Sequence, residues 1–175
     1  MRRSAQGFTL LELIIIVVII LLVAAIALPN LLRSRISANE AAAVSSVGSI
    51  NRAEVNYQTT YPTLGFATTL SALGPGPACA KPTAAQACLV ESALAAATSP
   101  SRSRGGYWFA LSGTGKDSAG VVNGYVVGGS AAAFNQSGVR DFCSVEDGVF
   151  HFRVPNGPSQ PVNSGPECTA MPILH

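Results

Sequence analysis

The sequence is poor in the side chains that most often carry catalysis or bind metal. It contains only two histidines, His151 and His175, and neither belongs to a serine or cysteine nucleophile pattern. Its four cysteines form no Cys-x-x-Cys pair, and no histidines stand at ligand spacing, which argues against a tetrahedral zinc site. We therefore expect no enzyme, no metal site and no cofactor.

The sequence also lacks a concentrated basic region. Charged residues make up 11% of the chain, with eleven basic and nine acidic side chains. The basic residues are scattered, and the nearest approach to a patch is Arg102 with Arg104, which we interpret as a solvated loop. We expect no nucleic-acid partner.

Charge is absent above all from the segment that follows Glu12. The 21 residues from Phe8 to Leu28 are interrupted only by Thr9 and Glu12, and about 20 apolar residues suffice to span a bilayer. A carboxylate near the centre of a span costs on the order of 2.5–3.5 kcal/mol. Glu12 therefore predicts a partner cation.

The residues before this segment indicate how such a cation arises. Arg2 and Arg3 form a positive head, and a cut between Gly7 and Phe8 would leave the hydrophobic helix on the protein with a free amine at its tip. A conventional signal peptide is the alternative, with cleavage after Ala27 and loss of the apolar segment. The length of the segment favours the first interpretation. Removal of Arg2 and Arg3 leaves nine basic and nine acidic side chains.

The string GFTLLE at residues 7–12, after a short basic leader and before an apolar helix, resembles the class III signal of type IV pilins and of type II secretion pseudopilins. The resemblance covers about residues 7–60. It implies that a prepilin peptidase cuts after Gly7 and N-methylates Phe8, that Glu12 is the family's assembly glutamate, and that Pro29 is its helix-softening proline. A weaker resemblance to some bacterial major pilins covers Phe142-Cys143 and residues 146–149.

Physical reasoning gives Phe8 and Glu12 a role in assembly. In a stack of such helices, the Phe8 amine of one subunit would pair with the Glu12 carboxylate of its neighbour. A buried ion pair is weak evidence for stability but a reasonable device for alignment, because misaligned neighbours leave both charges uncompensated.

We expect four regions along the chain: a leader at 1–7, a membrane or filament-core half-helix at 8–30, an amphipathic half-helix at 31–60 and a globular head at 61–175. Pro29 removes a backbone donor and should kink the helix without ending it. Apolar residues then recur at spacings of three, four or seven. They are Leu32, Ile36, Ala43, Val47, Ile50 and Tyr57, with Arg33, Arg35, Glu40, Arg52 and Glu54 at polar positions between them.

The head should be an α+β unit with an antiparallel sheet of about four strands. In residues 61–100 the apolar residues do not recur at a regular spacing, and short helical turns are expected only at 70–73 and 89–97. Strand-like patterns follow at 107–111, 121–127, 139–143 and 149–154. We expect the sheet to pack on the helix through Val47, Ile50 and Tyr57, with the tail from Pro155 on the sheet surface.

Four cysteines in a chain that leaves the cytoplasm predict two disulfides. Spacing favours Cys79 with Cys88 and Cys143 with Cys168, and the other two connectivities stay open. Asp141, Glu146 and Asp147 lie close in sequence; we interpret them as a solvated turn, with a calcium site as the alternative.

These features predict a structural subunit, similar to a major pilin, that assembles into a homo-oligomeric filament. The partners implied by resemblance are the membrane, prepilin peptidase, an assembly platform and its ATPase. The precursor would cross the inner membrane once and end in an extracellular pilus, or in a periplasmic pseudopilus if the chain is a secretion pseudopilin. A second alternative is a membrane-anchored minor tip or binding subunit, which the presence of Glu12 disfavours.

Overall fold

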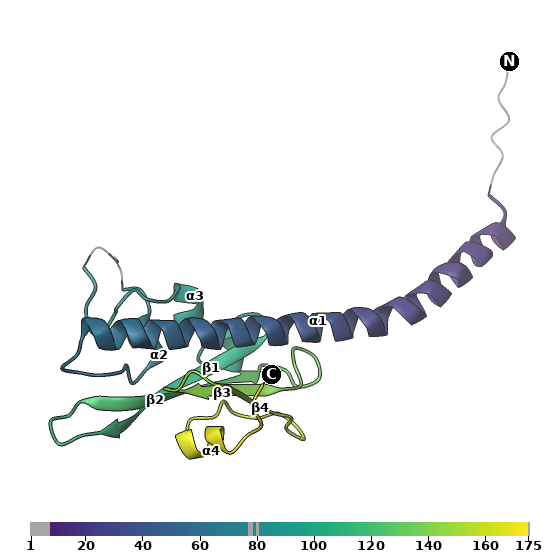
Figure 1. The fold of residues 1–175 in the computed structure, drawn as a ribbon. Helices are drawn as coiled ribbons and strands as arrows, with labels where there is room; N and C mark the ends of the chain where they lie inside the picture. Colours follow the sequence, from purple (N-terminus) through teal and green to yellow (C-terminus); the bar gives the residue numbers. More distant parts are fainter. Residues whose placement is uncertain (1–7, 77–78, 80, 175) are drawn as a thin grey trace. The chain divides into compact units, whose positions relative to one another are not determined.

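The computed structural model describes residues 8–76, 79 and 81–174 (Figure 1). A long helix, α1 (Leu10–Thr60), is followed by two short helices, α2 (Leu70–Leu73) and α3 (Ser92–Ala95). Four strands come next, β1 (Tyr107–Lys116), β2 (Val122–Ala131), β3 (Asp141–Val145) and β4 (Phe150–Arg153), and a last helix, α4 (Gly165–Thr169). The predicted α+β class is confirmed. The chain divides into two compact units, Met1–Arg35 and Ile36–His175.

Thr9 sets the start of α1. Its side-chain oxygen accepts a hydrogen bond from the Glu12 N–H at 3.2 Å, and its carbonyl accepts one from the Leu13 N–H at 3.2 Å. This is the arrangement of an N-cap residue, which satisfies a donor that the first helical turn leaves unpaired. The helix therefore begins at Leu10, two residues after Phe8.

Pro29 lies inside α1, which continues through it. Because proline has no N–H, the carbonyl four residues before it loses its usual helical donor. Beside it, the Asn30 amide Nδ2 donates to the Ile26 carbonyl at 3.3 Å. A kink at Pro29 stays a prediction.

The four strands form one antiparallel sheet in the order β1-β2-β3-β4. β1 and β2 extend beyond the predicted intervals, which stop at Leu111 and Val127 because the glycines that follow are typical of turns. In the structure two of these glycines permit close packing. A Cβ at Gly128 would lie 2.2 Å from the Val162 carbonyl oxygen, and one at Gly129 would lie 2.9 Å from the Phe109 ring.

One face of the sheet packs against the second half of α1 (Figure 1). Val47 and Ile50 have no exposed surface and Tyr57 is buried, so the predicted contact residues of the helix are confirmed. From the sheet, Tyr107, Phe109, Leu111, Tyr125, Val127 and Phe142 belong to the same cluster. Burial of large apolar side chains contributes about 1.5–3 kcal/mol each, and this cluster is the main core.

The opposite face of the sheet is covered by the C-terminal tail, including α4 (Figure 1). Val162 and Cys168 of the tail pack on Val126, Cys143 and Val145 of the sheet. Alternation along β2 explains the two clusters, because Val126 points to the tail while its neighbours Tyr125 and Val127 point to the helix. The sheet is thus buried on both faces.

Candidate functional site

The predicted assembly residues, Phe8 and Glu12, lie at the start of α1, and their side chains are exposed in the described chain. Phe8 is 72% exposed, and Glu12 is exposed as well. An 18-residue window of α1 has a mean hydropathy of 3.4 and none of it is buried, which makes α1 the one described helix long and apolar enough to cross a membrane. Gly7, the other side of the predicted cut, lies outside the described residues.

Glu12 presents a single negative charge on this apolar surface. Its backbone N–H is used by the Thr9 cap, and its carboxylate forms no salt bridge within the described part of the chain. Apart from Thr9, its exposed neighbours on the helix are apolar, including Leu11, Leu13 and Ile16. A lipid or helix surface laid against them would therefore also cover the carboxylate, which is costly unless a cation accompanies it.

Comparison with protein families gives one match. Residues 2–28 fit the family model described as the prokaryotic N-terminal methylation motif. The segment is a class III signal of the type IV pilin and pseudopilin kind. No curated protein and no solved structure matches the chain significantly. The motif is a structural, pilin-type signal and does not mark an enzyme family.

This signal supports a type IV pilin-like or pseudopilin protein. Together with the apolar part of α1, it fits a precursor that is anchored in the membrane and then processed. It also implies a prepilin peptidase and filament assembly. The match ends at Leu28, so the disulfide-bonded head has to be understood from its own contacts.

Two buried carboxylates attach α1 to the head, and Glu40 is the first. Its Oε1 accepts hydrogen bonds from the backbone N–H groups of Val139 and Arg140 at 3.0 and 3.1 Å. Its Oε2 lies 2.8 Å from Nε and 2.7 Å from Nη2 of Arg140, and its side chain is 7% exposed. Both oxygens are satisfied, as a buried carboxylate requires.

Glu54 is the second, and its side chain has no exposed surface. Its Oε2 accepts a hydrogen bond from the Ala67 N–H at 2.8 Å, whereas its Oε1 has no partner among the described residues. Burial raises the pKa of this carboxyl from 4.5 to about 8, and the Ala67 hydrogen bond opposes the rise only in part. Glu54 is therefore a neutral acid at pH 7.

Glu40 and Glu54 were predicted at polar positions between the apolar residues of the helix, whereas both are buried. A helix that is covered by a sheet on one side and by a connecting segment on another has a wider buried surface than one stripe. The partners, Arg140 and Ala67, are 100 and 13 residues away, so no local signal in the sequence indicates either contact.

A neutral polar contact joins the same helix to the centre of the sheet. The Asn51 Nδ2 donates to the Ser144 hydroxyl at 2.9 Å, and its Oδ1 accepts a hydrogen bond from the Tyr125 hydroxyl at 3.2 Å. Asn51 thus pairs with β3 and β2 at once, which fixes the register of the helix along the sheet.

Two disulfides close the head: Cys79–Cys88 in the segment after α2, and Cys143–Cys168 between β3 and α4. The tail has further attachments near the second bridge. Arg153 contacts the Asp141 Oδ2 at 2.9 Å and the Glu167 Oε1 at 2.6 Å. His151, which is buried, pairs its Nδ1 with the Met171 carbonyl at 2.8 Å, so this histidine has a structural contact.

The acidic residues of the β3–β4 region separate in space. Asp141 is buried beside Arg153 and also accepts a hydrogen bond from Ser159, while Glu146 and Asp147 are exposed in the turn. Asp147 closes this turn by accepting the Val149 N–H at 2.8 Å. Within the described residues, no group of three or more acidic, histidine or cysteine side chains is placed to hold a metal ion.

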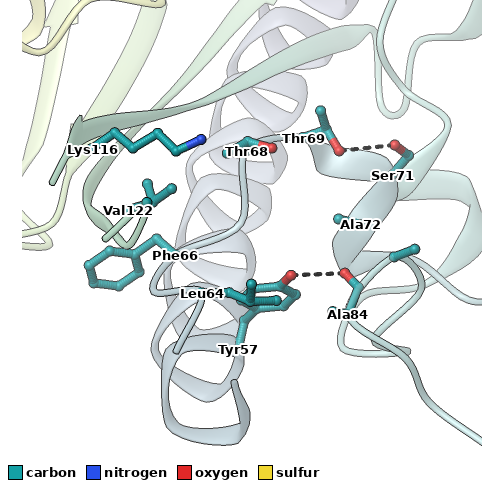
Figure 2. A pocket seen from close by; sticks show the side chains of 12 residues that line it. Tyr57, Leu64, Phe66, Thr68, Thr69, Ser71, Ala72, Ala84, Lys116 and Val122 are labelled. Atoms are coloured by element: carbon teal, nitrogen blue, oxygen red, sulfur yellow. Dashed lines mark hydrogen bonds between the residues drawn. The ribbon is translucent and has the colours of Figure 1, made fainter. Parts of the chain in front are cut away.

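A groove of about 490 Å³ opens where α1 ends, between the segment after it, α2 and the hairpin of β1 and β2 (Figure 2). Tyr57 and Phe66 contribute aromatic rings, and Thr68, Thr69 and Ser71 contribute hydroxyls. The Tyr57 hydroxyl donates to the Ala84 carbonyl at 2.8 Å across one end of the groove. No acid–base pair or nucleophile pattern lines it among the residues that the structure describes.

Arg104, which the sequence suggested as part of a solvated loop, instead joins two elements. Its Nη1 donates to the Ser46 hydroxyl of α1 at 2.9 Å, and its Nη2 pairs with Glu91. Arg102 stays exposed in the 3-10 turn Pro100–Arg102. The two arginines therefore do not act as one basic patch.

Proposed function

We propose that this protein is a structural subunit of a type IV pilus, similar to a major pilin. A prepilin peptidase cuts the Gly7–Phe8 bond and methylates the new amine of Phe8. An assembly platform and its ATPase then move the subunit from the inner membrane into an extracellular filament. The α1 segments of neighbouring subunits pack together in the filament, and the heads form its surface.

The observation that carries this proposal is the pairing of two features on one segment. The methylation motif at residues 2–28 includes the apolar first part of α1, whose side chains are exposed in the described chain. A secretion signal that is removed leaves no such helix on the protein, whereas a subunit that polymerises through its helices needs it. The two disulfides and the buried sheet supply a stable head for exposure outside the cell.

Within the filament, the Phe8 amine of one subunit pairs with Glu12 of the next. Replacement of Glu12 by Ala removes the charge that aligns neighbours, while the helix keeps or gains hydrophobicity for insertion. The expected result is normal membrane insertion with a large loss of filaments, measured by membrane fractionation and by electron microscopy of sheared fibres.

The matched control is Glu146→Ala, which removes an exposed carboxylate in a turn of the head. It should leave the filament yield close to that of the wild type. Filaments from Glu12→Ala that equal the wild type in number and length would contradict the alignment role of Glu12.

A pseudopilin of a type II secretion system is the alternative that uses the same signal and helix. The two disulfides and the lack of a metal-binding acidic cluster among the described residues favour the pilus. Electron microscopy of cells with native expression separates the two, because a pilin forms long surface fibres whereas a pseudopilus stays short. A minor tip subunit is disfavoured by Glu12, which gives the chain the means to be added repeatedly along a fibre.

A further inference from the structure

Glu54 joins α1 to the connecting segment 61–69, and among the described residues no other side-chain hydrogen bond joins these two elements. Its Oε2 accepts the Ala67 N–H, and Ala67 belongs to the connecting segment 61–69 between α1 and α2. Phe66 and Thr68, on either side of Ala67, line the groove near the end of α1 (Figure 2). The carboxyl thus lies directly behind the groove wall.

The other side of the segment is held by β2. The Phe66 N–H donates to the Val122 carbonyl at 3.0 Å, and the Val122 N–H donates to the Leu64 carbonyl at 2.9 Å. These two bonds involve no titratable group. The segment is therefore fixed to the sheet by backbone contacts. At its start the Tyr61 N–H donates to the Tyr57 carbonyl of α1 at 2.8 Å, and Phe66 and Ala67 pack in the main core, but the Glu54 carboxyl makes the side-chain hydrogen bond that holds Ala67 on the helix.

The surroundings of that carboxyl group favour its neutral form. It has no exposed surface, one oxygen has no partner, and it takes part in none of the salt bridges of the described residues. The titratable groups that act with it are Tyr57 on its own helix and Tyr125 on β2, and segment 61–69 adds Tyr61 against Tyr57. All three are neutral or anionic, so none compensates a negative charge on Glu54. The groove lining adds one cation, the exposed Lys116 at the end of β1, which forms no salt bridge with Glu54 in the described structure.

We propose that Glu54 is a proton-controlled latch: the neutral acid holds segment 61–69 on α1, and loss of the proton releases the segment from the helix while it stays on β2. The ionised carboxylate needs water, and the groove lined by Phe66 and Thr68, on either side of Ala67, can supply it. Movement of Ala67 away from α1 would open a route for this water and widen the groove.

The direction of the pH effect follows from the proton count. Burial raises the pKa of Glu54 to about 8, above its ordinary value of 4.5, so between these values the latched state holds a proton that the released state lacks. The proton-linked stabilisation of the latched state is fully present below pH 4.5. As the pH rises from there to about pH 8, the equilibrium constant for release increases about tenfold per pH unit. Burial, followed by the negative charge of Glu54, raises the pKa of Tyr57 and Tyr125, so both stay neutral over this range.

Hydrogen exchange of two backbone amides tests the proposal on the full-length mature protein in detergent micelles. The protection factor of the Ala67 amide, corrected for the intrinsic pH dependence of exchange, should fall about tenfold per unit between pH 6 and 8. The Phe66 amide, which is bonded to Val122, is the internal control and should keep its protection. In Glu54→Gln, Ala67 should show no pH dependence.

Two results would overturn the latch. If the protection of Ala67 is independent of pH, Glu54 does not control the contact. If Phe66 loses protection in parallel with Ala67, ionisation unfolds the head as a whole and releases no separate segment.

A direct titration keeps the proposal testable if Glu54→Gln does not fold. The six glutamates of the wild type are labelled with ¹³C at the carboxyl carbon and followed by NMR from pH 4 to 9. One resonance should titrate near pH 8, and it should persist in Glu12→Gln, which removes the glutamate of the apolar segment. Titration of all head glutamates below pH 6 would contradict the proposal.

Discussion

At the scale of single residues, three glutamates on α1 meet three different environments. Glu12 is exposed on an apolar surface, Glu40 is buried with all its oxygens paired, and Glu54 is buried with one oxygen unpaired. The same side chain therefore serves as a proposed contact between subunits, as an ion pair within the head and as a proton-dependent contact. The sequence identified only the first, because its position in an apolar run is a local signal.

Glu40 should be the most important single polar residue for attachment of α1 to the head. Replacement by Ala leaves two backbone N–H groups and the guanidinium of Arg140, whose side chain is 38% exposed, without their acceptor. Because water can reach the guanidinium, the expected cost is that of unsatisfied hydrogen-bond donors, about 1–3 kcal/mol. Urea unfolding at pH 7, followed by the fluorescence of Trp108, measures the change.

The control for this experiment is Glu91→Ala, which removes the partner of Arg104 in a pair with both side chains largely exposed. Exposed pairs contribute about 0–1 kcal/mol, so this variant should unfold close to the wild type. Equal effects of the two substitutions would show that Glu40 has no special role.

At the scale of elements, the sequence predicted the long helix, an antiparallel sheet of about four strands and the helix contacts Val47 and Ile50, because periodicity reports which face is buried. It also located α2, at residues 70–73. The predicted intervals for β1 and β2 were too short, because Gly113 and Gly128 were interpreted as turn residues. These glycines lie in strands, where other parts of the chain come too close for a side chain, a fact that depends on tertiary packing.

The two disulfides should contribute unequally to the stability of the head. The Cys143–Cys168 bridge spans 25 residues and Cys79–Cys88 spans 9. The loop-entropy model gives about 3.5 kcal/mol for the first and about 2.6 kcal/mol for the second. Urea unfolding of the double Ser variants of each pair measures this, with the larger loss expected for Cys143 and Cys168.

The tail should stay on the sheet when the second bridge is absent, because Arg153 with Glu167, Asp141 with Ser159, and His151 with Met171 attach it independently. Limited proteolysis of the folded Cys143→Ser, Cys168→Ser variant checks this. Rapid cleavage within residues 155–174 under native conditions would contradict it.

At the scale of the whole molecule, the chain joins two units with different physical requirements. Residues 8–35 expose apolar side chains that need a membrane or other helices, whereas the second unit buries its own core on both faces of a sheet. Composition predicted the apolar segment, since the run from Leu13 to Leu28 contains no charge, whereas the four predicted regions 1–7, 8–30, 31–60 and 61–175 stay predictions. The polar contacts between helix and sheet were not predictable, because each joins residues far apart in the sequence.

The filament function requires that the chain is processed between Gly7 and Phe8 and keeps its hydrophobic helix. Intact mass with N-terminal fragmentation, on protein purified from its native host, measures this. We expect a chain that begins at Phe8, carries one methyl group on its amine and lacks four hydrogens because of the two disulfides. A chain that begins after Ala27 would show that the segment is an ordinary signal peptide and would contradict the filament function.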